Sequence, residues 1–143
     1  MPIEPAAHHP PSRWRRVLVA SVFLVGLAVL VWMADQPRYQ SVLALTRRLP
    51  WRDKGAHFLA MGGVSFALNY ALRGRRWKIF GESLLVGTLL ALVLAIAEEG
   101  SQAWLPARVF DIDDLGAAGL GAILCGWVTD QLLKQGCFKI PPA

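Results

Sequence analysis

The residues best suited to chemistry lie in two short segments of the sequence. Residues 53–57 hold a carboxylate, an ammonium group and an imidazole, and residues 98–114 hold most of the remaining carboxylates together with an amide and a guanidinium group. On a helix, Asp53 and His57 share a face, as do Glu99 and Gln102. We therefore expect a binding site where the two segments meet, formed by Asp53, Lys54, His57, Glu99, Gln102, Arg108, Asp111 and Asp114.

His57 and Glu99 are the candidate catalytic residues. An imidazole titrates near neutral pH, so His57 is suited to general acid/base work if Asp53 or Glu99 orients it. The alternative is structural, because a histidine paired with a carboxylate also ties two helices together. The sequence leaves both interpretations open.

Glu99 follows a face of small residues and is expected to point into the protein, where it needs a cation or a hydrogen-bond donor. Arg108 is the expected partner and Lys54 the second choice. Arg108 has two possible roles: clamped by Asp111 or Asp114 it stabilises a loop, whereas left open it binds a phosphate or carboxylate with its fork of donors.

Three further carboxylates, Asp111, Asp113 and Asp114, are of the type that binds Mg²⁺ or Ca²⁺. Asp113 or Asp114 is better explained as the cap of a following helix, where an acidic side chain meets free N–H groups. The chain has no zinc-ligand spacing, no phosphate-binding loop and no Gly-x-Ser-x-Gly turn. We therefore expect no metal site and no cofactor, and an enzymatic role is the less favoured one.

The elements that position these residues are predicted to be membrane helices. Of the 143 residues, 55% are hydrophobic and only 17% are charged, against about 25% charged in soluble domains. The apolar residues form blocks of about 20, which is the length of a membrane-spanning helix. The two cysteines, Cys125 and Cys137, form no disulfide framework.

The predicted fold is all-α, a four-helix transmembrane bundle over residues 13–134. A disordered tail precedes it at 1–12 and a cytoplasmic tail follows at 135–143. The first block is too long for a signal peptide and has bulky residues where cleavage would require small ones, so we expect it to be retained. Residues 41–49 are either a helix lying on the membrane surface or a plain loop. The helices are expected at about 17–34, 55–72, 80–99 and 114–133.

Packing between these helices is predicted from small and polar residues. Ser65 and Asn69 place the second helix inside the bundle. In the third and fourth helices small residues recur every four positions, which allows close contact in lipid. These positions are Gly87, Ala91 and Ala95, and then Ala118, Ala122 and Gly126.

The formal charge of +5 is distributed as in a membrane protein, with basic clusters beside the apolar blocks, so no nucleic-acid partner is expected. Nine of the 15 Lys and Arg residues fall on the side of the termini and of the loop that begins at Arg73. Because basic loops stay inside, we expect both termini in the cytoplasm of a bacterium, with the chain crossing its plasma (inner) membrane.

The ordered polar residues resemble the VanZ-like family of integral membrane proteins. The resemblance covers roughly residues 53–126, and it departs from the family pattern at Met61, where an aromatic residue is common, and at Ala118, where Asn is common. It rests on Asp53-Lys54-x-x-His57-Phe58, Glu99-x-x-Gln102, Pro106-x-Arg108, Asp111-x-x-Asp114 and Gly121.

The resemblance implies a role in the cell envelope and, as for the founding member of the family, in resistance to the glycopeptide teicoplanin. Three functions remain open. The first is binding of an outer-leaflet lipid or lipid-linked cell-wall precursor through His57, Glu99 and Arg108. The second is a membrane enzyme that acts on a lipid headgroup, and the third is a structural or assembly subunit of a membrane complex. The oligomeric state is not indicated.

Overall fold

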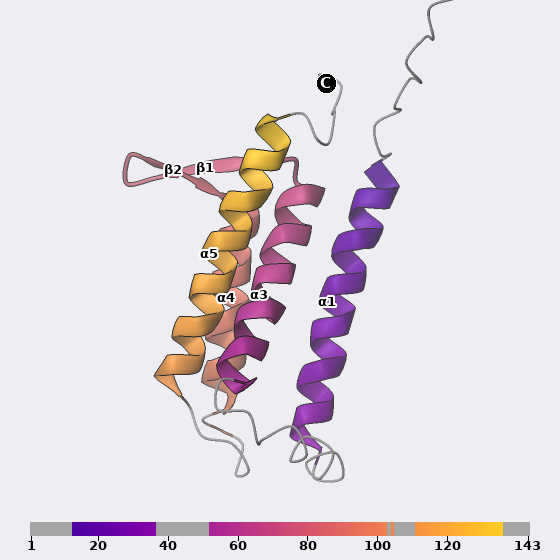
Figure 1. Cartoon of the computed structure of the whole chain (residues 1–143), viewed down its shortest axis with the longest axis vertical. Coiled ribbons are helices and arrows are strands. Elements are labelled where there is room, and N and C mark those ends of the chain that lie inside the picture. The colour runs from indigo at the N-terminus through magenta and orange to yellow at the C-terminus, as the bar shows by residue number, and fades with distance from the viewer. Residues whose placement is uncertain (1–12, 37–51, 103, 105–110, 136–143) are drawn as a thin grey trace, which may run out of the picture.

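The computed structural model describes residues 13–36, 52–102, 104 and 111–135, and these residues are mostly helical. Helices α3 (Arg52–Ala71), α4 (Val86–Gln102) and α5 (Ile112–Lys134) pack side by side, and α1 (Arg13–Asp35) lies against α3 at the edge of this group (Figure 1). The four predicted helices are thus present. The segments expected at 1–12 and 41–49 lie outside the described residues, and so do residues 136–143 of the expected C-terminal tail.

The third helix begins later than we expected. Instead of starting near residue 80, the chain first forms an antiparallel hairpin of β1 (Arg76–Ile79) and β2 (Glu82–Leu85). The two residues between the strands, Phe80 and Gly81, have φ angles of 51° and 87°, and positive values at both positions are the mark of a tight hairpin turn. Helix α4 therefore begins only at Val86.

Small residues line the contacts between the helices, as predicted. Gly87, Ala91 and Ala95 are buried on α4, and so are Ala118, Ala122 and Gly126 on α5. The helices approach closely at Gly121, where an added Cβ would overlap the backbone carbonyl of Phe58 on α3. Met61 and Val64 of α3 supply the larger buried side chains, each 1% exposed.

A buried hydrogen-bond network joins the three helices in the half of the bundle nearer the hairpin. The Ser65 hydroxyl donates to the Ala122 carbonyl at 2.7 Å, and the Asn69 amide donates to the Thr88 hydroxyl at 2.9 Å. Both side chains of α3 are fully buried, which confirms that this helix lies inside the group. Such bonds hold helices together where water is excluded.

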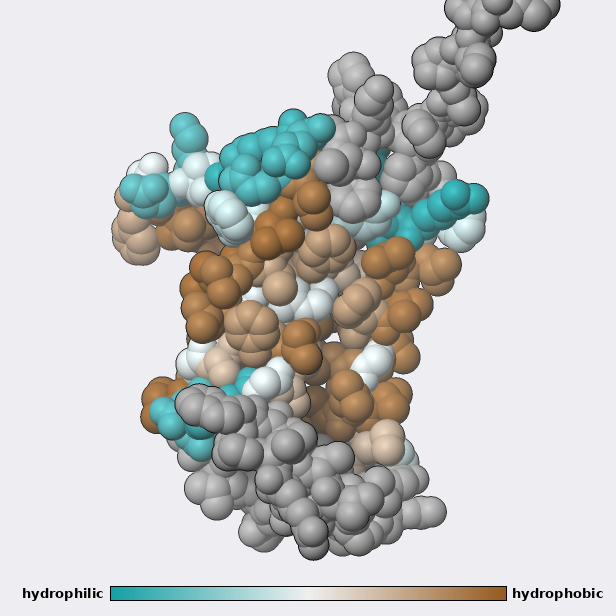
Figure 2. Space-filling model, in the orientation of Figure 1, coloured by the Kyte–Doolittle hydropathy of each residue, from teal (hydrophilic) through white to brown (hydrophobic). Residues whose placement is uncertain are grey.

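The outer surface of the helices is apolar. Large side chains such as Val25 and Leu30 of α1, Ile96 of α4 and Trp127 of α5 are exposed. On the face drawn in Figure 2, apolar residues form a band over the middle of the molecule, below hydrophilic residues near the hairpin. Within the described residues, two helices, Arg13–Met33 and Ile112–Lys134, are long and apolar enough to cross a membrane.

The hairpin end of the bundle is fixed by a set of ion pairs that the sequence analysis did not anticipate. Asp130 of α5 accepts from Arg76 of β1 at 2.7 Å and from Lys134 at the same distance. The Asp130 residue is only 8% exposed. These contacts attach the hairpin to the last turns of α5.

Candidate functional site

Six of the eight predicted site residues meet at the end of the molecule opposite the hairpin. Helices α3 and α5 begin there and α4 ends there, so their terminal turns lie close together (Figure 1). Eight described residues form what we call the polar end cluster: Lys54, His57, Glu98, Glu99, Gln102, Asp111, Asp113 and Asp114.

Asp111, and not Asp113 or Asp114, caps helix α5. Its backbone is extended, with φ −124° and ψ 113°, and its carboxylate accepts from the N–H of Asp113 at 2.9 Å. The prediction failed because the helix begins two residues earlier than expected, at Ile112. Asp113 and Asp114 lie instead in the first turn, where their charge still interacts favourably with the helix dipole.

Lys54 joins the start of α3 to the start of α5. Its ammonium group lies 2.9 Å from Asp113, 3.7 Å from Asp114 and 3.8 Å from Asp111. The pKa of Lys54 is raised above its usual 10.5, mainly by the hydrogen bond to Asp113 and further by the negative charges of the three aspartates. Burial of the ammonium group acts in the opposite direction. Lys54 precedes the apolar block that starts at Gly55, and within the described residues its ion pairs are with these aspartates.

Glu99 is held by hydrogen-bond donors on two sides. The residue is 1% exposed, and its Oε1 accepts from the backbone N–H of Asp111 at 2.8 Å. Its Oε2 accepts from the Gln102 amide at 3.3 Å, which confirms the predicted pairing of these two residues. The same amide also donates to Glu98 at 2.8 Å. Arg108, the first expected partner of Glu99, lies outside the described residues, so that pairing stays a prediction. Lys54, the second expected partner, pairs with the aspartates at the start of α5 instead.

His57 lies between two carboxylates without bonding closely to either. Its Nδ1 is 3.8 Å from Glu98 Oε2 and its Nε2 is 3.8 Å from Asp114 Oδ2. Both distances exceed those of hydrogen bonds. The sequence suggested Asp53 or Glu99 as the orienting group, whereas the ion-pair contacts of the ring are with Glu98 and Asp114, and Asp53 is exposed in the first turn of α3.

Glu98 is the member of the cluster that sequence reasoning missed. It lies one turn before Gln102 on α4, and this spacing was the available signal. Glu98, Glu99 and His57 each place one nitrogen or oxygen atom within 4.8 Å of the others. These three residues come from two helices, so no sequence spacing would have linked them.

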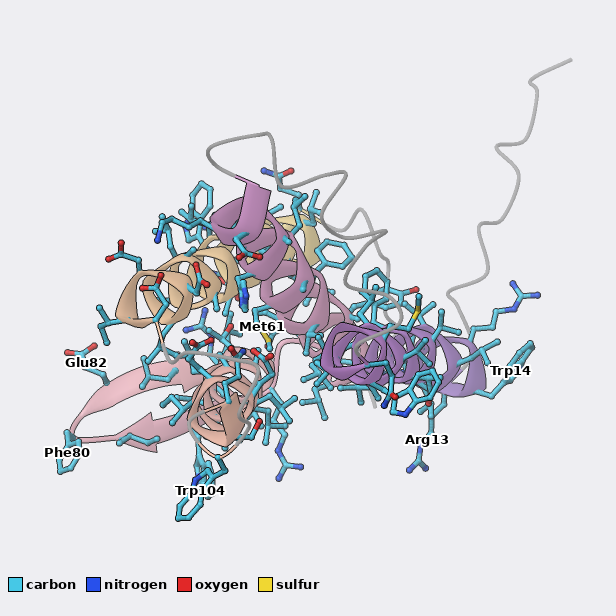
Figure 3. The ribbon with its side chains drawn as sticks, turned by 90° about the horizontal axis from the view of Figure 1, so that it is seen from below. Arg13, Trp14, Met61, Phe80, Glu82 and Trp104 are labelled. Carbon is cyan, nitrogen blue, oxygen red and sulfur yellow. The ribbon has the colours of Figure 1, made fainter. Side chains whose placement is uncertain are left out.

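Met61, where the chain departs from the VanZ-like pattern, lies one helical turn beyond His57. Figure 3 looks at the molecule from the end that carries the cluster and shows Met61 among the helices, whereas Trp104 points outward. Met61 is in the buried core together with Val64 and Ala118, the other point of departure. An apolar core thus lies directly beneath the polar end cluster.

A groove of about 440 Å³ lies between α1 and α3 and opens on the side of the molecule. Its α3 wall consists of Ala56, Leu59 and Ala60, which belong to the same turns of the helix as His57. The α1 wall is equally apolar and consists of Val22, Phe23, Gly26, Leu27 and Leu30.

Comparisons with known proteins do not extend this description. No protein-family model matches the chain, and no curated protein or solved structure matches it either.

Proposed function

We propose that the chain is a VanZ-like protein that crosses the bacterial plasma membrane four times, with both termini in the cytoplasm. The apolar surface that extends over α1, α4 and α5 supports membrane insertion. The basic residues at the start of α1 and in the β1 strand support the orientation, because basic segments stay on the cytoplasmic side. In this orientation the polar end cluster faces outward, with the hairpin in the cytoplasm.

The proposed activity is binding of an outer-leaflet lipid or lipid-linked cell-wall precursor, which would reduce the action of teicoplanin. The observation that carries this proposal is the groove between α1 and α3. It is lined by apolar residues, opens sideways toward the lipid, and lies at the same end of α3 as His57. A hydrocarbon chain in the groove would bring its headgroup to the level of the polar end cluster.

A membrane enzyme acting on a headgroup is less well supported. A general base is activated by a close hydrogen bond, whereas the carboxylates of Glu98 and Asp114 lie 3.8 Å from the His57 ring. The structural role is the second candidate. It is favoured by Lys54 and Glu99, whose contacts with Asp113 and with the Asp111 N–H connect α5 to both α3 and α4.

Filling the groove tests the binding proposal. A Cβ on Gly26 meets no atom within 4 Å and Gly26 lines the groove, so we expect the side chain introduced by Gly26→Leu to occupy part of it. Gly116→Leu is the matched control, because Gly116 also has open space around its Cβ and lies on α5, away from the groove.

We expect the Gly26→Leu protein to fold and to retain less lipid on purification, as measured by native mass spectrometry. Cells that express it should also be more sensitive to teicoplanin than cells that express the parent or Gly116→Leu. Equal lipid retention and equal sensitivity in all three would refute binding in the groove.

A further inference from the structure

The polar end cluster contains a set of side chains suited to holding a metal ion. His57 offers an imidazole nitrogen and Glu98 and Glu99 offer carboxylate oxygens, and these three atoms lie within 4.8 Å of one another. In tetrahedral zinc sites ligand atoms are roughly 3.3 Å apart, given metal–ligand distances near 2.1 Å. The three ligand atoms would therefore have to move closer together when the ion binds.

The imidazole is oriented as a metal ligand usually is. Nδ1 faces Glu98 and Nε2 faces Asp114, each at 3.8 Å. Histidines that bind metals commonly direct their second nitrogen to a carboxylate, which fixes the ring and strengthens the ligand. Asp114 is the carboxylate that faces Nε2, and its side chain is 13% exposed; a shift of the ring or of the carboxylate would bring the two within hydrogen-bond distance.

Hydrogen-bond donors also hold the carboxylates of the two glutamates in place. The Gln102 amide donates to both carboxylates, at 2.8 and 3.3 Å, and the Asp111 N–H donates to Glu99 at 2.8 Å. Such hydrogen bonds hold ligating carboxylates in position. Two carboxylates close together and largely shielded from water also repel each other, and a divalent cation between them would remove that repulsion.

We propose that His57, Glu98 and Glu99 bind one divalent transition-metal cation. The mixed ligand set indicates its class, because imidazole favours ions such as Zn²⁺ and Fe²⁺ whereas carboxylates favour Mn²⁺ and Mg²⁺. Three protein ligands leave further coordination positions free for water or a ligand oxygen. The cation site stands on these residues alone and does not depend on the proposed lipid-binding role.

The test is a titration of the full-length, chelator-treated protein in detergent with Co²⁺, followed by visible absorption, and with Zn²⁺, followed by melting temperature. All proteins carry His8→Ala and His9→Ala and a purification tag without histidine, so that the N-terminus does not bind the metal. Glu98→Gln removes one ligand oxygen while conserving shape, and Asp114→Asn weakens the group behind the imidazole. Glu82→Gln, in the exposed hairpin, is the control.

We expect the parent to take up one equivalent of Co²⁺ and to melt at a higher temperature with Zn²⁺. Asp114→Asn should bind 10- to 100-fold more weakly, as is typical for loss of a supporting group, and Glu98→Gln should lose at least as much. Glu82→Gln should match the parent. The proposal is overturned if the parent shows no saturable uptake of Co²⁺, or if folded Glu98→Gln, His57→Gln and parent proteins bind it equally.

Discussion

Lys54 and His57 are three residues apart on α3, yet their surroundings differ. The ammonium group of Lys54 lies among three aspartates, with the nearest oxygen at 2.9 Å. His57 faces carboxylates at 3.8 Å on both sides of its ring. We therefore propose that Lys54 stabilises the bundle, whereas His57 takes part in the proposed function.

The first prediction concerns Lys54. Because the aspartates raise its pKa above 10.5, Lys54 stabilises the folded protein at pH values below 10.5, and the effect is lost as the pH rises through the raised pKa. We expect Lys54→Met to melt at a lower temperature than the parent near neutral pH, with a difference that shrinks at strongly alkaline pH.

The measurement is thermal unfolding in detergent across this pH range. Lys78→Met, in the exposed β1 strand, serves as the control and should behave like the parent throughout. This role of Lys54 would be contradicted if Lys54→Met and the parent melt at the same temperature near neutral pH. It would also be contradicted if the difference in melting temperature stays the same at strongly alkaline pH.

At the scale of elements, the contact between α3 and α5 depends on residues without side chains. An added Cβ at Gly121 would overlap the Phe58 carbonyl, and this atom belongs to a backbone that cannot move aside easily. A Cβ at Gly116, on the same helix, meets nothing within 4 Å.

We accordingly expect Gly121→Ala to lower stability by about 1–3 kcal/mol, the usual cost of overpacking a close contact. Gly116→Ala should leave stability unchanged or raise it, because alanine favours helix more than glycine does. Comparison of denaturation curves in detergent would check this, and equal stability of the two variants would show that the helices are not in close contact at Gly121.

Hydropathy and the spacing of small residues predicted the helices and their buried faces where the pattern lies within one stretch of the sequence. The faces at Gly87, Ala91 and Ala95 and at Ala118, Ala122 and Gly126 are buried as expected. The hairpin was missed because Leu84 and Leu85 continue into the apolar run of α4, so hydropathy alone did not separate strand from helix. Its turn also uses Phe80 at a positive φ, which the residue type does not reveal.

For the candidate site too, the sequence predicted contacts between residues that are close together along the chain. Glu99 and Gln102 lie on one helix, so their pairing followed from spacing, and the meeting of the two segments was expected. The choice of partners was not, since the contact between Lys54 and Asp113 joins residues 59 positions apart. Such contacts are set by how the helices pack, which the sequence specifies only through the whole fold.

At the scale of the whole molecule, the polar end cluster and the hairpin lie at opposite ends of an apolar surface. If the chain crosses the membrane as proposed, these ends face opposite compartments. Ser101, at the cluster end of α4, and Ser83, in the hairpin, are both exposed and differ from cysteine by one atom.

We predict that Ser101→Cys reacts with a membrane-impermeant maleimide in intact spheroplasts, whereas Ser83→Cys reacts only after permeabilisation. Cys125 and Cys137 are replaced by Ser in both proteins to remove background labelling. The reverse labelling pattern would contradict the orientation, and labelling of both without permeabilisation would contradict the insertion.

The central claim is that the polar end cluster serves a function beyond holding three helices together, and His57→Ala tests it most directly. Folded yield and thermal stability in detergent are measured together with the teicoplanin susceptibility of expressing cells. Because the carboxylates that face His57 lie 3.8 Å from its ring, beyond hydrogen-bond distance, we predict a stability loss of only about 1 kcal/mol, typical of a single substitution, together with a loss of protection. A variant that misfolds, or that folds and still protects fully, would contradict the claim.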